Sequence, residues 1–219
     1  MRRILLILPL LAALGACMDI PQAPKRQGSR PASGSISNRP EYRQCLSELG
    51  TQQASFMPLP DQYFSPGCSN VGTVRLANLR SDSALLELSN LGPVTCPLAT
   101  TFAAWARFGV DRAAEQILGS RLVRIETFGS YSCRNIAGTN RRSGHASANA
   151  IDVSAFVLAD GRRISVLGGW NGGTPAERRF LRIVHESACK RFGTVLGPDY
   201  NSAHDNHFHL EADGARFCR

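Results

Sequence analysis

The sequence predicts an α+β domain with an antiparallel central sheet and flanking helices. Several short stretches alternate apolar with polar residues, as half-buried strands do, while other stretches carry apolar residues at helical spacing. Turn signals such as Asp160-Gly161 join neighbouring strand patterns directly, so we expect those strands to pair as antiparallel hairpins. Hairpins that form one sheet and helices that pack against it together define the α+β class.

The first half of the domain combines a hairpin with helices. The hairpin pattern turns near Ser81, and the stretch that follows Cys96 places Leu98, Phe102 and Trp105 on one helical face. We expect helices at 41–49, 96–108 and 111–118, and strands at 72–79, 84–88 and 121–128.

The second half opens with an apolar strand at 150–157. The chain then turns at Asp160-Gly161 and returns along 163–167. A glycine-rich stretch around Trp170 follows, which reads either as one wall of a groove or as a plain connection over a buried tryptophan.

A clear signal for the start of a helix follows this connection. Thr174 and Glu177 have the spacing of a capping box, and Pro175 occupies the first helical position between them. We therefore expect a helix that runs to about residue 191, a short strand at 194–196 and a last strand at 207–211.

Three of the five histidines lie within six residues, in the run HDNHFHLE. His207 and His209 are two residues apart in a stretch that alternates polar with apolar residues, and Glu211 continues the same alternation. Residues i and i+2 of a strand point to the same face. Two imidazoles on one strand face can reach one small site, where one binds a metal ion and the other handles a proton.

A second polar pair lies upstream, where His145 precedes Asp152 by seven residues. Asp152 is a lone carboxylate in an apolar strand, so it should be paired or bound to a metal ion. A salt bridge with an arginine would explain Asp152 alone, and surface histidines would explain a lone His-x-His pair. The conjunction favours a catalytic zinc site, which needs three protein ligands of nitrogen or oxygen type and one open position.

These residues resemble known zinc peptidases. The pattern from Ser143 to Asp152 resembles the SxHxxGxAxD signature of M15-type D-alanyl-D-alanine peptidases, which belong with the lysostaphin-like and hedgehog-like zinc folds. The His-x-His pair resembles the murein endopeptidase branch of that group. The stretch from Cys133 to Glu211 also resembles the bacterial extensin-like C-terminal domain family. The resemblance covers most of residues 41–219 and implies an M15/hedgehog-like zinc peptidase fold.

The resemblance also implies roles for individual residues. Ala148 stands where the signature has glycine, and the Glu-x-x-His ending of the carboxypeptidase branch is absent, which favours the His-x-His mode. The implied zinc ligands are His145, Asp152 and His209, with His207 as general base or transition-state stabiliser, His204 as a further active-site histidine, and Arg134 as the arginine that holds a substrate carboxylate or carbonyl.

The resemblance therefore implies a zinc-dependent peptidase that hydrolyses peptide bonds in the stem peptides or cross-links of murein (peptidoglycan). Three alternatives stay open. The first is a non-catalytic murein-binding lipoprotein that retains the zinc site, because a fold does not guarantee an activity. The others are a structural lipoprotein that ties a membrane to the wall and a zinc amidase that cleaves the sugar–peptide amide.

The N-terminus reads as an export signal. A basic start and an apolar run at 4–14 predict a signal peptide at 1–16 that is too short to span a membrane. The run Leu14-Gly15-Ala16-Cys17 resembles a bacterial lipobox, which predicts a lipidated Cys17; an ordinary signal peptide with a chance cysteine is the alternative. Residues 17–40 are rich in Pro, Ser, Gly and Arg and predict a disordered tether before a domain at 41–219. We expect the protein at the periplasmic face of the bacterial envelope, anchored to the outer membrane.

Six cysteines follow Cys17, and an even set in an exported protein predicts disulfide bonds. No pair among them has the Cys-x-x-Cys spacing of a structural zinc site. Spacing favours the pairs Cys45–Cys68, Cys96–Cys133 and Cys189–Cys218. A bridge at Cys133 would fix the loop of the adjacent Arg134.

The net charge is +8, and nearly all positive residues are arginines. A basic surface suits an acidic polymer such as murein, with its peptide carboxylates, or anionic lipid headgroups. Export and disulfide bonds exclude nucleic acid as a partner, because they place the protein in another compartment.

Overall fold

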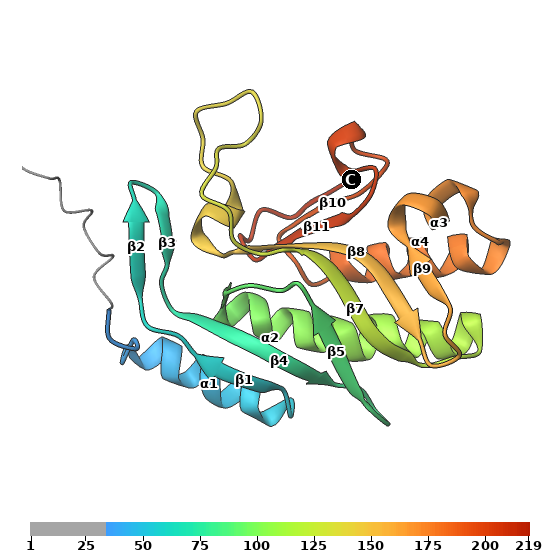
Figure 1. The fold of residues 1–219 in the computed structure, drawn as a ribbon, viewed down its shortest axis with the longest axis horizontal. Coiled ribbons are helices and arrows are strands. Elements are labelled where there is room, and N and C mark those ends of the chain that lie inside the picture. Colours follow the sequence, from blue (N-terminus) through green and yellow to red (C-terminus); the bar gives the residue numbers. More distant parts are fainter. Residues whose placement is uncertain (1–33) are drawn as a thin grey trace, which may run out of the picture. The chain divides into compact units, whose positions relative to one another are not determined.

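The structure, a computed structural model, describes residues 34–219. The predicted signal peptide, Cys17 and most of the predicted tether lie outside the described residues. The fold is mixed α+β and is built on one large, mainly antiparallel sheet (Figure 1), which confirms the predicted class. Within residues 34–219, no helix has both the length and the apolar character needed to cross a membrane.

The main sheet has ten strands in the order β1-β4-β5-β7-β8-β11-β10-β12, with β6 beside β4 and β9 beside β8. Its pairs are antiparallel except β5 with β7 and β10 with β12, which are parallel. β2 and β3 form a separate hairpin. The strands are β1 (Ser55–Pro58), β2 (Gln62–Ser65), β3 (Cys68–Asn70), β4 (Thr73–Arg80), β5 (Leu85–Ser89), β6 (Val94–Thr95), β7 (Leu122–Gly129), β8 (Ala150–Leu158), β9 (Arg163–Ser165), β10 (Thr194–Leu196), β11 (Phe208–Glu211) and β12 (Phe217–Cys218).

Four α-helices accompany the sheet: α1 (Pro40–Thr51), α2 (Cys96–Trp105), α3 (Val166–Gly172) and α4 (Pro175–Cys189). The helical path of α2 continues through two π-helical segments, η1 (Ala106–Asp111) and η2 (Ala114–Leu118), over the two stretches predicted as helices. The capping box predicted at the start of α4 is present, with reciprocal bonds between Thr174 and Glu177.

Buried aromatic rings join α2, α4 and the sheet into one core. Trp105 of α2 is fully buried, and its indole N–H donates to the Val184 carbonyl of α4 at 3.1 Å. The same ring contacts Phe156 of β8 and Phe192 after α4. These contacts fix β8, the strand that carries Asp152, against the helices.

Two parts of the chain differ from the sequence prediction. Residues 55–70, where no strand was predicted, form β1 and the β2–β3 hairpin. These strands are stabilised by pairing with other strands, and their own weak alternation of apolar and polar residues does not indicate a strand. The glycine-rich connection and the end of the strand predicted at 163–167 form α3, because the Ser165 side chain caps a helix there by accepting from Gly168 N. Trp170 of α3 is buried and contacts Phe208, which agrees with the second of the two interpretations, a connection over a buried tryptophan.

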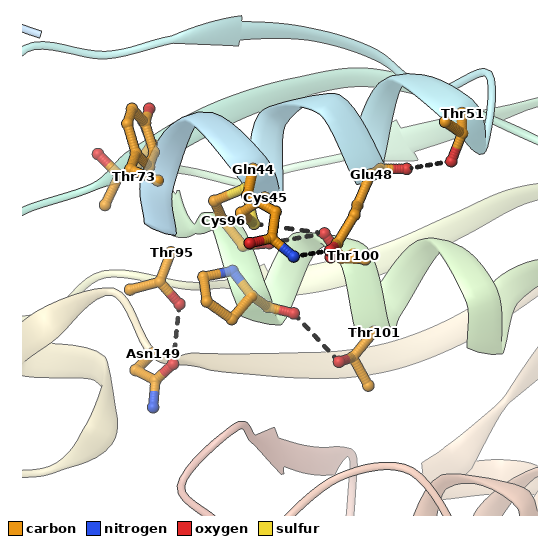
Figure 2. Close-up of a disulfide and its surroundings, with 12 residues drawn as sticks. Gln44, Cys45, Glu48, Thr51, Thr73, Thr95, Cys96, Thr100, Thr101 and Asn149 are labelled. Atoms are coloured by element: carbon orange, nitrogen blue, oxygen red, sulfur yellow. Dashed lines mark hydrogen bonds between the residues drawn. A yellow bond between two sulfur atoms is a disulfide. The ribbon is translucent and has the colours of Figure 1, made fainter. Parts of the chain in front are cut away.

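The disulfide prediction is correct for one pair and wrong for two. Cys189 pairs with Cys218 as predicted, but Cys45 pairs with Cys96 and Cys68 pairs with Cys133. The reason is tertiary: α1 packs on α2, which brings Cys45 to the first residue of that helix (Figure 2). Cys68 lies in β3, beside the loop that contains Cys133.

A cavity of about 410 Å³ lies over the Cys45–Cys96 bond, between α1 and α2. Its polar side chains are bonded within their own helices: Gln44 donates to Glu48, and the hydroxyl of Thr101 donates to the Pro97 carbonyl (Figure 2). The hydroxyl of Thr100 donates to the Cys96 carbonyl and also lies 3.6 Å from Cys45 Sγ of the other helix. These polar groups therefore already have partners within the helix pair.

Candidate metal centre

The pairing of β8 with β7 and β11 builds the centre of the site. Asp152 of β8 lies directly opposite His209 of β11 on one side and opposite Gly129 of β7 on the other. Because directly opposed residues of antiparallel strands point to the same face, this register brings the carboxylate and the imidazole together. Phe208 and Leu210, which alternate with His209, are fully buried in the core, as predicted.

His145 reaches the same point from a tight turn. It lies in the 3₁₀ turn η3 (Gly144–Ser147), whose N-cap is Ser143. The turn ends at Ala148, which adopts the left-handed conformation with φ = 54°. This position explains why the resembling signature has glycine there, since glycine adopts positive φ without a Cβ penalty.

Three side chains converge. His145 Nε2 lies 3.2 Å from His209 Nδ1 and 3.1 Å from Asp152 Oδ2, and His209 Nδ1 lies 2.8 Å from Asp152 Oδ1. A tetrahedral zinc ion with bonds of about 2.0–2.1 Å separates its ligand atoms by roughly 3.3 Å. The two imidazole nitrogens are spaced close to this separation, and each has its own carboxylate oxygen of Asp152 beside it, so the three residues can each offer one ligand atom to a single ion.

The outer nitrogens of both rings are bonded to oxygen acceptors. His145 Nδ1–H donates to the Ser130 carbonyl at 3.1 Å, and His209 Nε2–H donates to Glu211 Oε1 at 2.6 Å. The inner nitrogens, His145 Nε2 and His209 Nδ1, face the Asp152 carboxylate and each other. A buried carboxylate between two imidazoles needs a positive charge beside it, and oxygen partners on the outer nitrogens are typical of metal-binding histidines.

The electrostatics agree with this need for a cation. Burial raises the pKa of Asp152, but hydrogen bonds with His145 and His209 outweigh it and hold that pKa well below its usual range. Burial lowers the pKa of His209, but Asp152 and Glu211 outweigh burial and raise that pKa to about 9. The pocket thus stabilises one positive charge beside an ionised carboxylate, and a metal ion can supply that charge in place of a proton.

His207 and His204 lie beside these donors. His207 Nε2 is 3.4 Å from Asp152 Oδ1, and its Nδ1–H donates to Asn206 Oδ1 at 2.7 Å. His204 lies with its ring centroid 5.1 Å from that of His207, and its Nδ1–H donates to Asn201 Oδ1 at 2.7 Å. Each ring therefore has an unprotonated Nε2.

Burial keeps both of these rings neutral. It lowers the pKa of His207, against the opposing charge of Asp152. It also lowers the pKa of His204 to about 4, helped by the neighbouring His207 and His209. Neutral imidazoles at neutral pH can accept a proton.

Arg134 lies at the rim. Its side chain is exposed, and its charge is close enough to His204 to lower the pKa of that ring, as the smallest of the causes. Within residues 34–219 no carboxylate forms an ion pair with it, so the guanidinium is open to a ligand. The adjacent Cys133 is bridged to Cys68, which ties this loop to β3.

Exposed aromatic rings continue the rim on both sides of the histidines. Phe128 is 55% exposed, and its ring centroid lies 5.9 Å from that of His207. Tyr200 is 42% exposed and lies 5.5 Å from His204 by the same measure. The three converging side chains are thus buried or nearly so, and exposed aromatic rings lie beside the neighbouring histidines.

A further group of His185, Cys189 and Cys218 also has metal-type side chains close together. The two cysteines form a disulfide bond, so they have no thiolates to offer. His185 contacts Trp170 and Phe208 in the core, as an ordinary buried histidine does.

All six residues singled out in the sequence thus lie in one region. The sequence did not identify Ser130, Asn201 or Asn206, because a carbonyl or amide that accepts from a histidine carries no pattern of its own. Glu211 had a signal, since it continues the alternation of the His-x-His strand by two residues.

A family model described as "Extensin-like protein C-terminus" matches residues 43–219, which is most of the chain. The chain therefore belongs to this family. No curated protein and no solved structure is significantly similar to it.

Proposed function

We propose that this member of the extensin-like C-terminal family is an envelope-anchored, zinc-dependent peptidase of murein. The proposal rests above all on one observation: His145, Asp152 and His209 bring two imidazole nitrogens and a carboxylate together, with N···N and N···O separations of 2.8–3.2 Å. The resemblance of the same residues to murein peptidases supports the choice of substrate.

His145, Asp152 and His209 would hold the zinc ion. Nitrogen and carboxylate donors suit zinc, and three protein ligands leave a coordination position open. When bound, zinc polarises a carbonyl and lowers the pKa of water to about 7, which supplies the chemistry of peptide hydrolysis.

His207 would serve as the general base. Burial keeps its ring neutral, Asn206 accepts from its Nδ1–H, and Nε2 is then the nitrogen that can accept a proton. Nε2 lies 3.4 Å from Asp152 Oδ1, beside the proposed ligand atoms. The same ring can return that proton to the leaving amine.

His204 and Arg134 would orient the substrate. His204 Nε2 is also unprotonated and lies next to His207, so it can accept a hydrogen bond from the substrate or assist in proton transfer. Arg134 has an exposed guanidinium without a carboxylate partner among the described residues, and such a group can bind a substrate carboxylate with two parallel hydrogen bonds. Murein stem peptides carry such carboxylates.

The proposed location follows from the N-terminus. The basic, apolar leader and Leu14-Gly15-Ala16-Cys17 support export, lipidation of Cys17 and anchoring at the periplasmic face of the outer membrane. Fatty-acid labelling of the wild type that disappears in Cys17→Ser would support the anchor; unchanged labelling would exclude Cys17.

The decisive experiment incubates purified protein with sacculi of its own organism, with and without a chelator. We expect soluble products whose release stops with chelation and returns with zinc. Product masses separate the activities: monomers from cross-linked dimers indicate an endopeptidase, loss of a terminal residue a carboxypeptidase, and free stem peptides an amidase. Zinc-loaded protein that binds sacculi and releases nothing would replace the enzyme with a murein-binding lipoprotein.

A further inference from the structure

Glu211 lies behind His209, on the far side of the imidazole ring from Asp152. We propose that Glu211 is a positioning residue that orients His209 as a metal ligand, and that residue 144 is glycine in order to admit the Glu211 carboxylate. This inference rests on the proposed zinc site and adds to it two residues outside the ligand set.

The first observation is the hydrogen bond. His209 Nε2–H donates to Glu211 Oε1 at 2.6 Å, and the two residues share one strand face. A bond from an imidazole to a carboxylate fixes which nitrogen carries the proton and how the ring is turned. Here it leaves Nδ1 as the nitrogen that faces Asp152, 2.8 Å from Oδ1, where a metal ion can replace the proton between them.

The second observation is the space at Gly144. A Cβ atom built there would lie 2.6 Å from Glu211 Cδ and 2.7 Å from each carboxylate oxygen, closer than real Cβ contacts come. Gly144 is not among the residues with positive φ, so its backbone conformation does not require glycine. The absent side chain makes room for the carboxylate.

The third observation is that the Glu211 carboxylate is held between two segments that carry ligands. Gly144 opens the turn that presents His145, and Glu211 ends the strand that presents His209. The Glu211 backbone is fixed by pairing with Ala150 on one side and Thr194 on the other. Within residues 34–219, His209 is the only basic group that pairs with Glu211, so no arginine or lysine ion pair competes for its role.

Removal of such a carboxylate partner typically lowers metal affinity by about 10–100-fold. We therefore expect Glu211→Ala to weaken zinc binding by about this factor while circular dichroism shows the fold intact; the metal-free protein should lose some thermal stability, because the His209–Glu211 pair is gone. Glu211→Gln retains an oxygen acceptor and should recover part of the affinity. Glu126→Gln is the matched control, since that carboxylate also lies in a strand but pairs with Arg163.

Gly144→Ala tests the same contact from the other side. The new methyl group meets the end of a long side chain, so the protein should fold and the carboxylate should move. Zinc affinity should fall as in Glu211→Ala, and the double variant should be no weaker than the weaker single variant, because both changes break one interaction. Gly50→Ala, whose new methyl group would meet nothing within 4 Å, provides a control glycine in α1.

The measurement is competition for zinc with a chromophoric chelator, together with the absorption spectrum of the cobalt-loaded protein, which reports ligand geometry without any substrate. A changed cobalt spectrum in Glu211→Ala and Gly144→Ala supports the positioning role. Wild-type zinc affinity and spectrum in both variants would overturn it and leave the peptidase proposal intact. Wild-type protein that binds no zinc would overturn both.

Discussion

The groove between α1 and α2 and the cluster of histidines at β8 and β11 differ in where their polar groups point. In the groove, Gln44 and Thr100 form hydrogen bonds within their own helices, and a disulfide bond closes the floor (Figure 2). In the cluster, side chains from separate segments bond outward to Ser130 and Glu211, and their inner atoms face one another around Asp152. A cavity alone therefore indicates little, whereas metal-type side chains from separate segments that converge on a buried carboxylate indicate a ligand.

The two regions also depend on different interactions. The helix pair is joined by a disulfide bond and by buried apolar contacts, so changes there should lower the stability of the fold. The cluster depends on strand register and on hydrogen bonds around each ring. Changes in one region should leave the other intact, and the following predictions test this separation.

The largest effect is expected from loss of a ligand. His145→Ala and Asp152→Ala should each reduce bound zinc from about one ion per chain to almost none, because only two donors would remain. Both variants should stay folded, because the apolar core beneath the site is unchanged. Metal analysis after dialysis measures the outcome, with circular dichroism as the check on folding; wild-type zinc content in both would disprove the ligand assignment.

His207→Ala should separate chemistry from metal binding. The ring lies beside the donors without belonging to the ligand triangle, so most of the zinc and the fold should remain. General acid–base groups contribute about 10²–10⁴-fold to rates, and murein cleavage should fall by a factor in this range. Full activity in this variant would leave the fold untouched and remove His207 from the mechanism.

The donors could be predicted from the sequence because they lie in short local patterns. Strand alternation places His209 and Glu211 on one face, and the signature-like run contains both His145 and Asp152. The same locality explains why the helix at 174–191 was recognised from its capping box.

The features that the sequence did not predict depend on contacts between distant segments. The Cys45–Cys96 and Cys68–Cys133 pairs follow from helix packing and from the position of β3, neither of which has a sequence signal. The parallel pairing of β5 with β7 and the Ser130 carbonyl that orients His145 are of the same kind. Register and packing, rather than residue type, decide these features.

Removal of the disulfide bond between α1 and α2 should lower stability and leave zinc binding unchanged, whereas removal of a ligand should abolish zinc binding and leave the fold intact. The Cys45–Cys96 bond closes a segment of 51 residues, and the chain-entropy model gives about 4 kcal/mol for a loop of this size. The double variant Cys45→Ala/Cys96→Ala should lose stability on this order in urea denaturation. Its zinc content, measured while it is folded, should equal that of the wild type; a parallel loss of zinc would show that the two regions are coupled, through the bond between Thr95 and Asn149 that Figure 2 shows.

The smallest effect is expected at the rim, where Arg134 is exposed. An exposed guanidinium that binds a substrate carboxylate gains less than a buried one, because water and salt screen the pair. Arg134→Ala should therefore lower kcat/KM on murein peptides by about tenfold, near the low end of the range for a charged hydrogen bond. Zinc content should be unchanged. Arg141→Ala is the matched control, because Arg141 is an exposed arginine of the same loop. Because added salt already weakens an exposed pair, the difference between Arg134→Ala and wild type should shrink as ionic strength rises, while Arg141→Ala should follow the wild type throughout. Equal losses in both variants would mean that the loop attracts the acidic polymer only through its total charge, and that Arg134 has no specific place in substrate binding.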